Sequence, residues 1–287
     1  MSYWNAPALE QTSPTTRSLV QSWKAYVPVV DRRLPAWARR SDPIVRRHLG
    51  IYWKMLPLDL SELVRAYLLI CALILLSIAL PALLPLVFIL LPVSLVMLPL
   101  VFYAYGRVLL ATAAFTTRMI VDEQANNTLN LLRTTPVTLP HIVFSKAAAG
   151  VWRQIEDLSL LFYAVLFLTL PVIGLQYGAY FPYEDGSLIS RLVLIVGLGT
   201  ALARLVLEPF MIAALAILIG ALIPVRTTAL VALGVTAFFY FLLVNFPRLM
   251  PLTPAAFIVI EFVVPVALPL LIAWGALRAA VWALRQD

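Results

Sequence analysis

Charged residues inside long apolar stretches are the first candidates for chemistry in this sequence. The candidates that we consider are Arg107, Arg204, Glu208 and Glu261. An arginine at the centre of a bilayer costs about 2.5–3.5 kcal/mol on insertion scales, so each side chain is expected to face protein or water. Arg204 and Glu208 stand four residues apart on one expected helix and can pair with each other. The alternative is that they line a substrate cavity at a protomer interface.

A polar stretch, 121–146, interrupts the apolar runs and is the second candidate. Within it, residues 126–133 can form a short helix with Leu129 and Leu132 on one face. Pro136 ends that helix, and Pro140 restarts the chain into the next apolar segment. A soluble subunit that grips a helix held in this way can move both neighbouring spans as rigid bodies. An amphipathic linker that lies on the surface without a partner fits the same spacing.

Catalysis within the chain is not expected. The sequence has no G-x-x-x-x-G-K-[ST] loop for a nucleotide, and it contains only 11 glycines. Its two histidines, His48 and His141, belong to segments that look unrelated, and neither has metal-ligand spacing. A single cysteine, Cys71, excludes an internal disulfide and a cysteine-based metal site. We therefore expect neither a metal nor a cofactor in this chain.

Composition identifies the class of protein. Only 12% of the 287 residues are charged and the mean hydropathy is +0.95, whereas soluble domains have about 25% charged residues. The apolar runs are too long and unbroken for the strands of a barrel. The net charge of +7 is spread along the flanks of these runs, which indicates orientation in a membrane rather than nucleic-acid binding. The sequence thus predicts an all-α membrane protein.

Six spans and their orientation follow from the apolar runs and their flanks. The predicted spans are 63–80, 85–110, 158–173, 188–222, 228–244 and 264–284. A proline-bounded piece, 255–263, is too short to cross alone and is expected to be re-entrant or interfacial. Lys and Arg concentrate on one side, which places both termini and the loop 119–146 in the cytosol.

The N-terminal region, 1–60, is basic and rich in aromatic residues. Asp42 and Pro43 are expected to open a helix, as N-cap and first helical residue. A basic amphipathic helix of this composition lies on a membrane surface, although a disordered basic tail is the alternative. We therefore divide the chain into this region and a six-span transmembrane domain, 61–287.

Two motifs resemble those of type-2 ABC exporter permeases. The polar stretch resembles their first cytoplasmic loop, with its T-L-x-x-L-x-x-T-P core and the lysine that opens the third span. Residues 42–49, DPIVRRHL, are similar to the N-P-[IV]-[LV]-x-[KR]-E-L stretch with which many of these permeases begin. Together with the six-span plan, the resemblance covers residues 42–284. The matching loop positions give the partner-coupling residues: Glu123, Thr128, Leu129, Leu132, Arg133 and Pro136.

The resemblance implies a transmembrane subunit that couples a separate ATPase to substrate movement. ATP and magnesium would bind the ATPase subunit. The chain would form a homo- or heterodimer of permease chains among membrane lipids, in a bacterial cytoplasmic membrane. The loop departs from the family at Asn127, Asn130 and Gln124, where the family has a glycine and two acidic residues, and at Arg133, where it has a leucine. The second hypothesis is therefore a permease-like structural subunit of a larger complex, with other integral membrane subunits as its partners.

Overall fold

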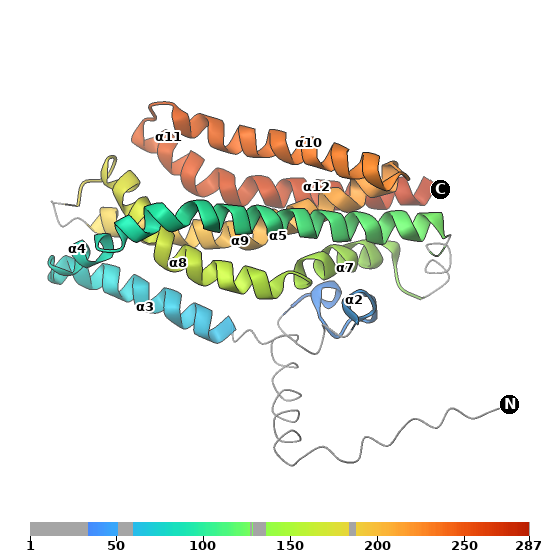
Figure 1. Cartoon of the computed structure of the whole chain (residues 1–287), viewed down its shortest axis with the longest axis horizontal. Helices are drawn as coiled ribbons and strands as arrows, with labels where there is room; N and C mark the ends of the chain where they lie inside the picture. The colour runs from blue at the N-terminus through green and yellow to red at the C-terminus, as the bar shows by residue number, and fades with distance from the viewer. Residues whose placement is uncertain (1–33, 51–59, 127, 129–135, 184–187, 287) are drawn as a thin grey trace, which may run out of the picture.

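Long apolar segments determine this fold, because in hydrocarbon a chain must satisfy its backbone hydrogen bonds internally and helices do so. The computed structural model describes residues 34–50, 60–126, 128, 136–183 and 188–286, and these form a helical bundle without β-strands (Figure 1). The elements are η1 (Ala36–Ala38), α2 (Pro43–Leu49), α3 (Leu60–Ala79), α4 (Leu83–Phe88), α5 (Leu91–Ala125), α7 (Leu139–Trp152), α8 (Ile155–Gly178), α9 (Leu188–Leu222), α10 (Arg226–Asn245), η3 (Phe246–Leu249), α11 (Pro254–Ile258), η4 (Val259–Val263) and α12 (Val264–Gln286).

Six helical stretches are long and apolar enough to cross a membrane, which confirms the expected number of spans. They are Glu62–Ala79, Leu91–Ala125, Ile155–Gly178, Leu188–Leu222, Arg226–Leu249 and Pro254–Arg285. Large apolar side chains on α3, α5, α10 and α12 are exposed, among them Leu69 (71%), Val96 (70%) and Phe238 (64%). Such surfaces are stable in lipid and unstable in water, so this is the fold of an integral membrane protein.

Helix α9 is the centre of the bundle, and 67% of its most apolar 18-residue stretch is buried. It contacts α3, α5, α7, α8, α10 and α12. The second half of α9 packs with α7, α10 and α12 in one apolar core, around buried residues such as Ile212 and Leu277. The first half packs with α3, α5 and α8 in another, around Leu166 and Leu198. Most side chains of α9 are therefore held by neighbouring helices.

The two ends of the bundle differ in what gathers there. At one end, which we call the α7 end, lie α7, the last turns of α5 and α12, and the start of α10 (Figure 1). At the opposite α11 end lie α4, α11 and the segment that follows α8 (Figure 1). α5 and α9 have 35 residues each, about 52 Å at 1.5 Å per residue, which exceeds the roughly 30 Å hydrocarbon core. Both helices therefore extend beyond the hydrocarbon.

Two stretches differ from the sequence-based expectation. The piece 255–263 continues without interruption into the last span, because α11, a π-helical turn (η4) and α12 follow one another directly. The segment that Pro140 opens does not run directly into the expected third span, 158–173, because it breaks at 153–154 into α7 and α8. α7 neither projects from the bundle nor presents a wet face, since its small residues from Ala147 to Gly150 are buried among α2, α5, α9 and α12.

Helix α2 packs on α7 and lies in the described part of the basic N-terminal region, together with η1. Asp42 caps it, accepting from the backbone N–H groups of Ile44 and Val45, as expected for an Asp-Pro start. Val45 and Leu49 are buried against Ala148 and Ala149 of α7. α2 is thus a packed part of the bundle.

Candidate functional site

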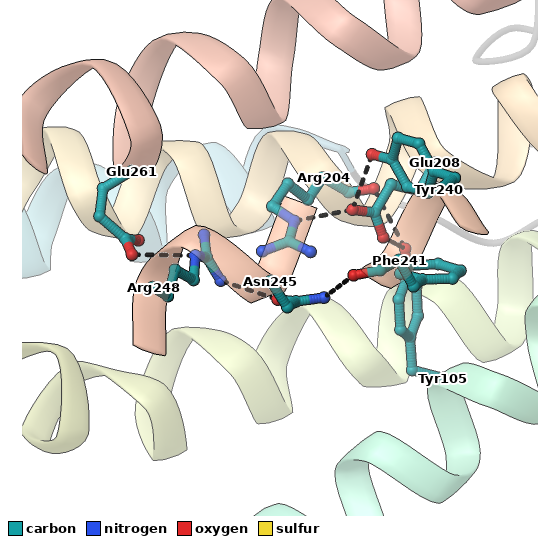
Figure 2. A network of polar contacts seen from close by, with 8 residues as sticks. All are labelled: Tyr105, Arg204, Glu208, Tyr240, Phe241, Asn245, Arg248 and Glu261. Carbon is teal, nitrogen blue, oxygen red and sulfur yellow. Dashed lines mark hydrogen bonds and ion pairs between the residues drawn. The ribbon is translucent and has the colours of Figure 1, made fainter. Parts of the chain in front are cut away.

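A buried carboxylate inside the bundle organises the most polar site of the spanning helices. Glu208 on α9 is 0% exposed, and its Oε1 accepts from Nε of Arg204, one turn earlier, at 2.8 Å. The hydroxyl of Tyr105 on α5 donates to Oε2 at 2.6 Å, and that of Tyr240 on α10 donates to Oε1 at 3.3 Å (Figure 2). Three helices therefore meet at one carboxylate, which is the condition under which a buried charge is tolerated.

A second ion pair lies nearby, toward the α11 end. Nε of Arg248, on η3, is 2.9 Å from Oε1 of Glu261, in the π turn η4 (Figure 2). Nη1 of Arg248 also donates to Oδ1 of Asn245 at 3.2 Å. A π turn inserts one residue into a helix and shifts the direction of its side chains, and such turns are frequent at functional sites. This pair joins the end of α10 to the start of the last span.

Both ion pairs line one cavity of about 400 Å³. Its wall comes from α5, α8, α9, α10, η3 and η4, and most of the wall is apolar, with Leu98, Val101 and Phe241 as examples. Phe102, which is 67% exposed, and Asn245 place part of this wall at the molecular surface. A mostly apolar cavity with a few convergent polar groups is the usual form of a ligand site.

Three of the four intramembrane residues picked out in the sequence meet in this cavity. They are Arg204, Glu208 and Glu261, and the expected pairing of Arg204 with Glu208 is present. Arg107 lies elsewhere: it is exposed on α5 and does not line the cavity. Sequence reasoning missed Tyr105 and Tyr240, whose only signal was a hydroxyl inside an apolar run. It did not single out Arg248.

A second polar cluster lies at the α7 end, where α5 and α7 flank the segment that joins them. Lys146 on α7 is 0% exposed, and its ammonium forms an ion pair with Oε2 of Glu123 on α5. Burial lowers the pKa of Lys146, and the neighbouring Glu123 carboxylate partly offsets this. The pair holds the end of α5 against α7. In the sequence, this end of α5 directly precedes the short helix predicted at residues 126–133.

His48 of α2 completes this cluster. Burial, with the positive charges of Lys146 and Arg47, lowers the pKa of His48 to about 4, so the ring is neutral at pH 7. Its Nε2 is 3.6 Å from Oε1 of Glu123, a separation too long for a hydrogen bond. This contact is therefore a packing contact between α2 and α5 rather than a charged pair.

The sequence suggested that the two histidines belong to unrelated segments, but the structure shows that these segments pack together. His141, at the start of α7, is 2.6 Å from Oδ2 of Asp42, the residue that caps α2. His48, at the other end of α2, reaches Glu123. The packing of α2 on α7 brings each histidine to its own partner, and contacts between positions this far apart in the sequence leave no local pattern. Together they fasten α2 to the start of α7 and the end of α5.

The predicted partner-coupling residues are only partly within the described structure. Leu129, Leu132 and Arg133 lie outside the described residues. Glu123 is 7% exposed and its carboxylate faces Lys146. Thr128 donates through Oγ1 to the carbonyl of Glu123 at 3.3 Å, and Pro136 is exposed.

The site therefore has two parts on one continuous bundle: a charged cavity among the spanning helices, and a polar junction where α2, α5 and α7 meet. Helix α9 lines the first and packs against α5 and α7 at the second. Comparison with protein-family models, with curated proteins and with solved structures finds no match for this chain.

Proposed function

We propose that this chain is the transmembrane permease subunit of an ABC-type exporter, which couples a separate ATPase to substrate movement. The observation that carries the proposal is the cavity of about 400 Å³, lined by two ion pairs among membrane-spanning helices. Charges are expensive inside a bilayer and mark substrate or ion pathways when they surround a cavity. The chain carries no nucleotide-binding loop, so the energy source belongs to a partner.

The coupling route would run through the segment between α5 and α7. α5 contributes Tyr105 to the cavity and Glu123 to the junction, so one rigid helix connects the two parts of the site. α7 is fixed to α5 by the buried pair of Lys146 with Glu123. A partner that moves this segment would therefore move α5, and with it one wall of the cavity.

The second candidate function is a permease-like structural or accessory subunit of a larger membrane complex. One observation favours it: the carboxylate of Glu123, a position expected to take part in coupling, is turned inward to Lys146. An acidic group engaged inside the chain is not free to contact a partner. The chain would then be held by other integral membrane subunits and would move no substrate.

A single substitution separates the two functions. Leu132→Asp puts a charge at a position proposed to be buried in the cleft of an ATPase, where an unpaired charge is expensive. We expect the variant to insert and fold, but to lose the co-purifying ATPase or its stimulation by substrate. Thr138→Asp, at an exposed position nearby, is the matched control and should retain both. A stable complex of the wild-type chain without any nucleotide-binding subunit would exclude the exporter.

A further inference from the structure

We propose that the cavity binds the anionic head group of an amphiphile, whose chain lies along the apolar wall. This rests on the proposed function only in regarding the bound molecule as a substrate. The site itself is argued from its hydrogen-bond donors and its lining.

Both oxygens of the Glu208 carboxylate already accept hydrogen bonds within the chain. The carboxylate receives one guanidinium N–H and two tyrosine hydroxyls, from Arg204, Tyr105 and Tyr240. Because the side chain is fully buried behind these donors, it has no exposed oxygen for a ligand. A positively charged ligand therefore cannot form a direct contact with the deepest acidic group of the site.

The arginines, in contrast, have donors to spare. A guanidinium carries five N–H groups, and Arg204 uses the one at Nε for Glu208. Its two terminal nitrogens point away from Glu208, toward the side where Asn245 and Arg248 lie (Figure 2). The side chain of Arg204 is 20% exposed, and the cavity is the space that it lines.

Arg248 adds a second guanidinium to the same cavity. It contacts Glu261 through Nε and Asn245 through Nη1, and 22% of its side chain is exposed. Glu261 is only 7% exposed, so the arginine rather than the carboxylate is the accessible member of the pair. Two cations on one wall repel each other, and a bound phosphate, sulfate or carboxylate would stabilise both through charge-assisted hydrogen bonds.

The remaining lining indicates that the anion is attached to an apolar chain. Apolar side chains from α5, α8 and α10 form most of the wall, and they include Leu98, Phe102, Val172 and Phe241. Phe102 is also exposed on the bundle surface, where lipid would surround it. A small inorganic anion would leave this apolar wall uncovered, whereas an anionic amphiphile would use both kinds of surface.

Binding can be measured on the full chain in phosphatidylcholine nanodiscs with radiolabelled dodecyl phosphate, empty nanodiscs being subtracted. We expect saturable binding, competed at least tenfold less well by dodecyltrimethylammonium, which has the same chain and opposite charge. Inorganic phosphate, which has the head group alone, should compete only at far higher concentration. Equal competition by the cationic amphiphile would overturn the proposal, and so would inorganic phosphate that competes as well as dodecyl phosphate.

Variants assign the binding to the cavity. Arg248→Gln should weaken dodecyl phosphate binding about tenfold or more, since a hydrogen bond to a charged group is lost. Arg248→Gln/Glu261→Gln removes the pair without leaving a lone charge and should weaken it equally, which covers failure of the single variant to fold. Arg278→Gln, at an exposed position on α12, should bind like wild type. Undiminished binding in a folded double variant would overturn the proposal. This outcome does not depend on whether an ATPase co-purifies.

Discussion

The Nε of Arg204 lies 2.8 Å from Oε1 of Glu208, and both residues come from the same face of the most buried helix, α9. The pair is not isolated, because the hydroxyls of Tyr105 and Tyr240 reach the same carboxylate. Removing one charge therefore leaves the other in a low-dielectric site with fewer partners than it needs. The pair is the point at which α5, α9 and α10 depend on one another.

A double-mutant cycle measures this dependence. Arg204→Ala and Glu208→Ala should each destabilise the chain by about 3–5 kcal/mol, the usual penalty for breaking a buried pair. The double variant should lose clearly less than the sum, because it leaves no charge behind. Thermal unfolding midpoints in detergent give the comparison, with Arg107→Ala as an exposed control. Strict additivity would show that the two side chains do not interact.

Tyr105 of α5 offers a finer test of the contacts around Glu208. Tyr105→Phe removes only the hydroxyl that donates to Oε2 of Glu208 at 2.6 Å, which should cost about 1.5–3 kcal/mol because the acceptor is charged. Tyr103→Phe is the matched control, since Tyr103 lies on the same helix and is 74% exposed. The unfolding midpoint should fall for the first variant and stay within error for the second. Equal midpoints would remove Tyr105 from the network.

What the sequence predicts well is local. The i,i+4 spacing of Arg204 and Glu208 lies within one helix, so their pairing follows from helical geometry alone. The bounds of α9, predicted as 188–222, match the structure because a long apolar run has clear ends. Nothing comparable points to the pair of Arg248 with Glu261. Its formation depends on the chain reversal after α10 and on a π turn, neither of which has a sequence period.

The junction at the α7 end shows the same limit. His48 and Glu123 are 75 positions apart, and only the packing of Val45 and Leu49 on α7 brings them into contact. The break between α7 and α8 was not predicted, because neither proline nor glycine marks residues 153–154. Tertiary packing decides such details, and a single sequence does not encode them in any short window.

Lowering the pH should reduce the stability of the junction between α2, α5 and α7, because His48 becomes protonated. In the folded chain its pKa is lowered from 6.5 to about 4, so the folded state binds fewer protons than the unfolded state between these values. The stability contribution is therefore complete above about pH 6.5 and is lost as the pH falls toward 4. The full loss is about 3 kcal/mol for a shift of this size.

The measurement compares wild type with His48→Gln, which cannot titrate in this range. Unfolding midpoints of the two proteins, recorded from pH 7.5 to 4.5, should converge or cross as the pH falls, because only wild type has the ring to protonate. Other acidic groups titrate in both proteins and cancel in the difference. A difference that is constant across the range would contradict a buried, neutral His48.

The proposed orientation places the α7 end in the cytosol and the α11 end outside. Single cysteines at Thr138 and Leu249, both exposed and at opposite ends, test this in a Cys71→Ala background. In sealed right-side-out vesicles, an impermeant thiol reagent should label Leu249→Cys at once and Thr138→Cys only after the membrane is opened. The reverse order would invert the orientation, and labelling of both from one side would contradict six spans.

The close approach of Gly197 to Tyr177 supports the cavity wall, and a single added methyl group would disrupt it. Gly197 of α9 faces the ring of Tyr177, and a Cβ added there would lie 2.9 Å from both Cζ and Oη of that ring. Tyr177 cannot easily retreat, because it is 3% exposed and packs edge-on against Phe257 and Phe262, with ring centroids 5.0 and 5.6 Å away. The methyl group must therefore displace the ring or push α8 from α9.

Gly197→Ala should accordingly destabilise the chain by about 1–3 kcal/mol, the usual effect of overpacking. Gly234→Ala on α10 is the control, because its Cβ would meet nothing within 4 Å and alanine favours the helix, by up to about 1 kcal/mol. The same two variants also test the ligand site, since Tyr177 lines the cavity. Gly197→Ala should weaken dodecyl phosphate binding, and Gly234→Ala should leave it unchanged. If Gly197→Ala unfolds at the same temperature as wild type, the contact between α8 and α9 does not resist an added methyl group.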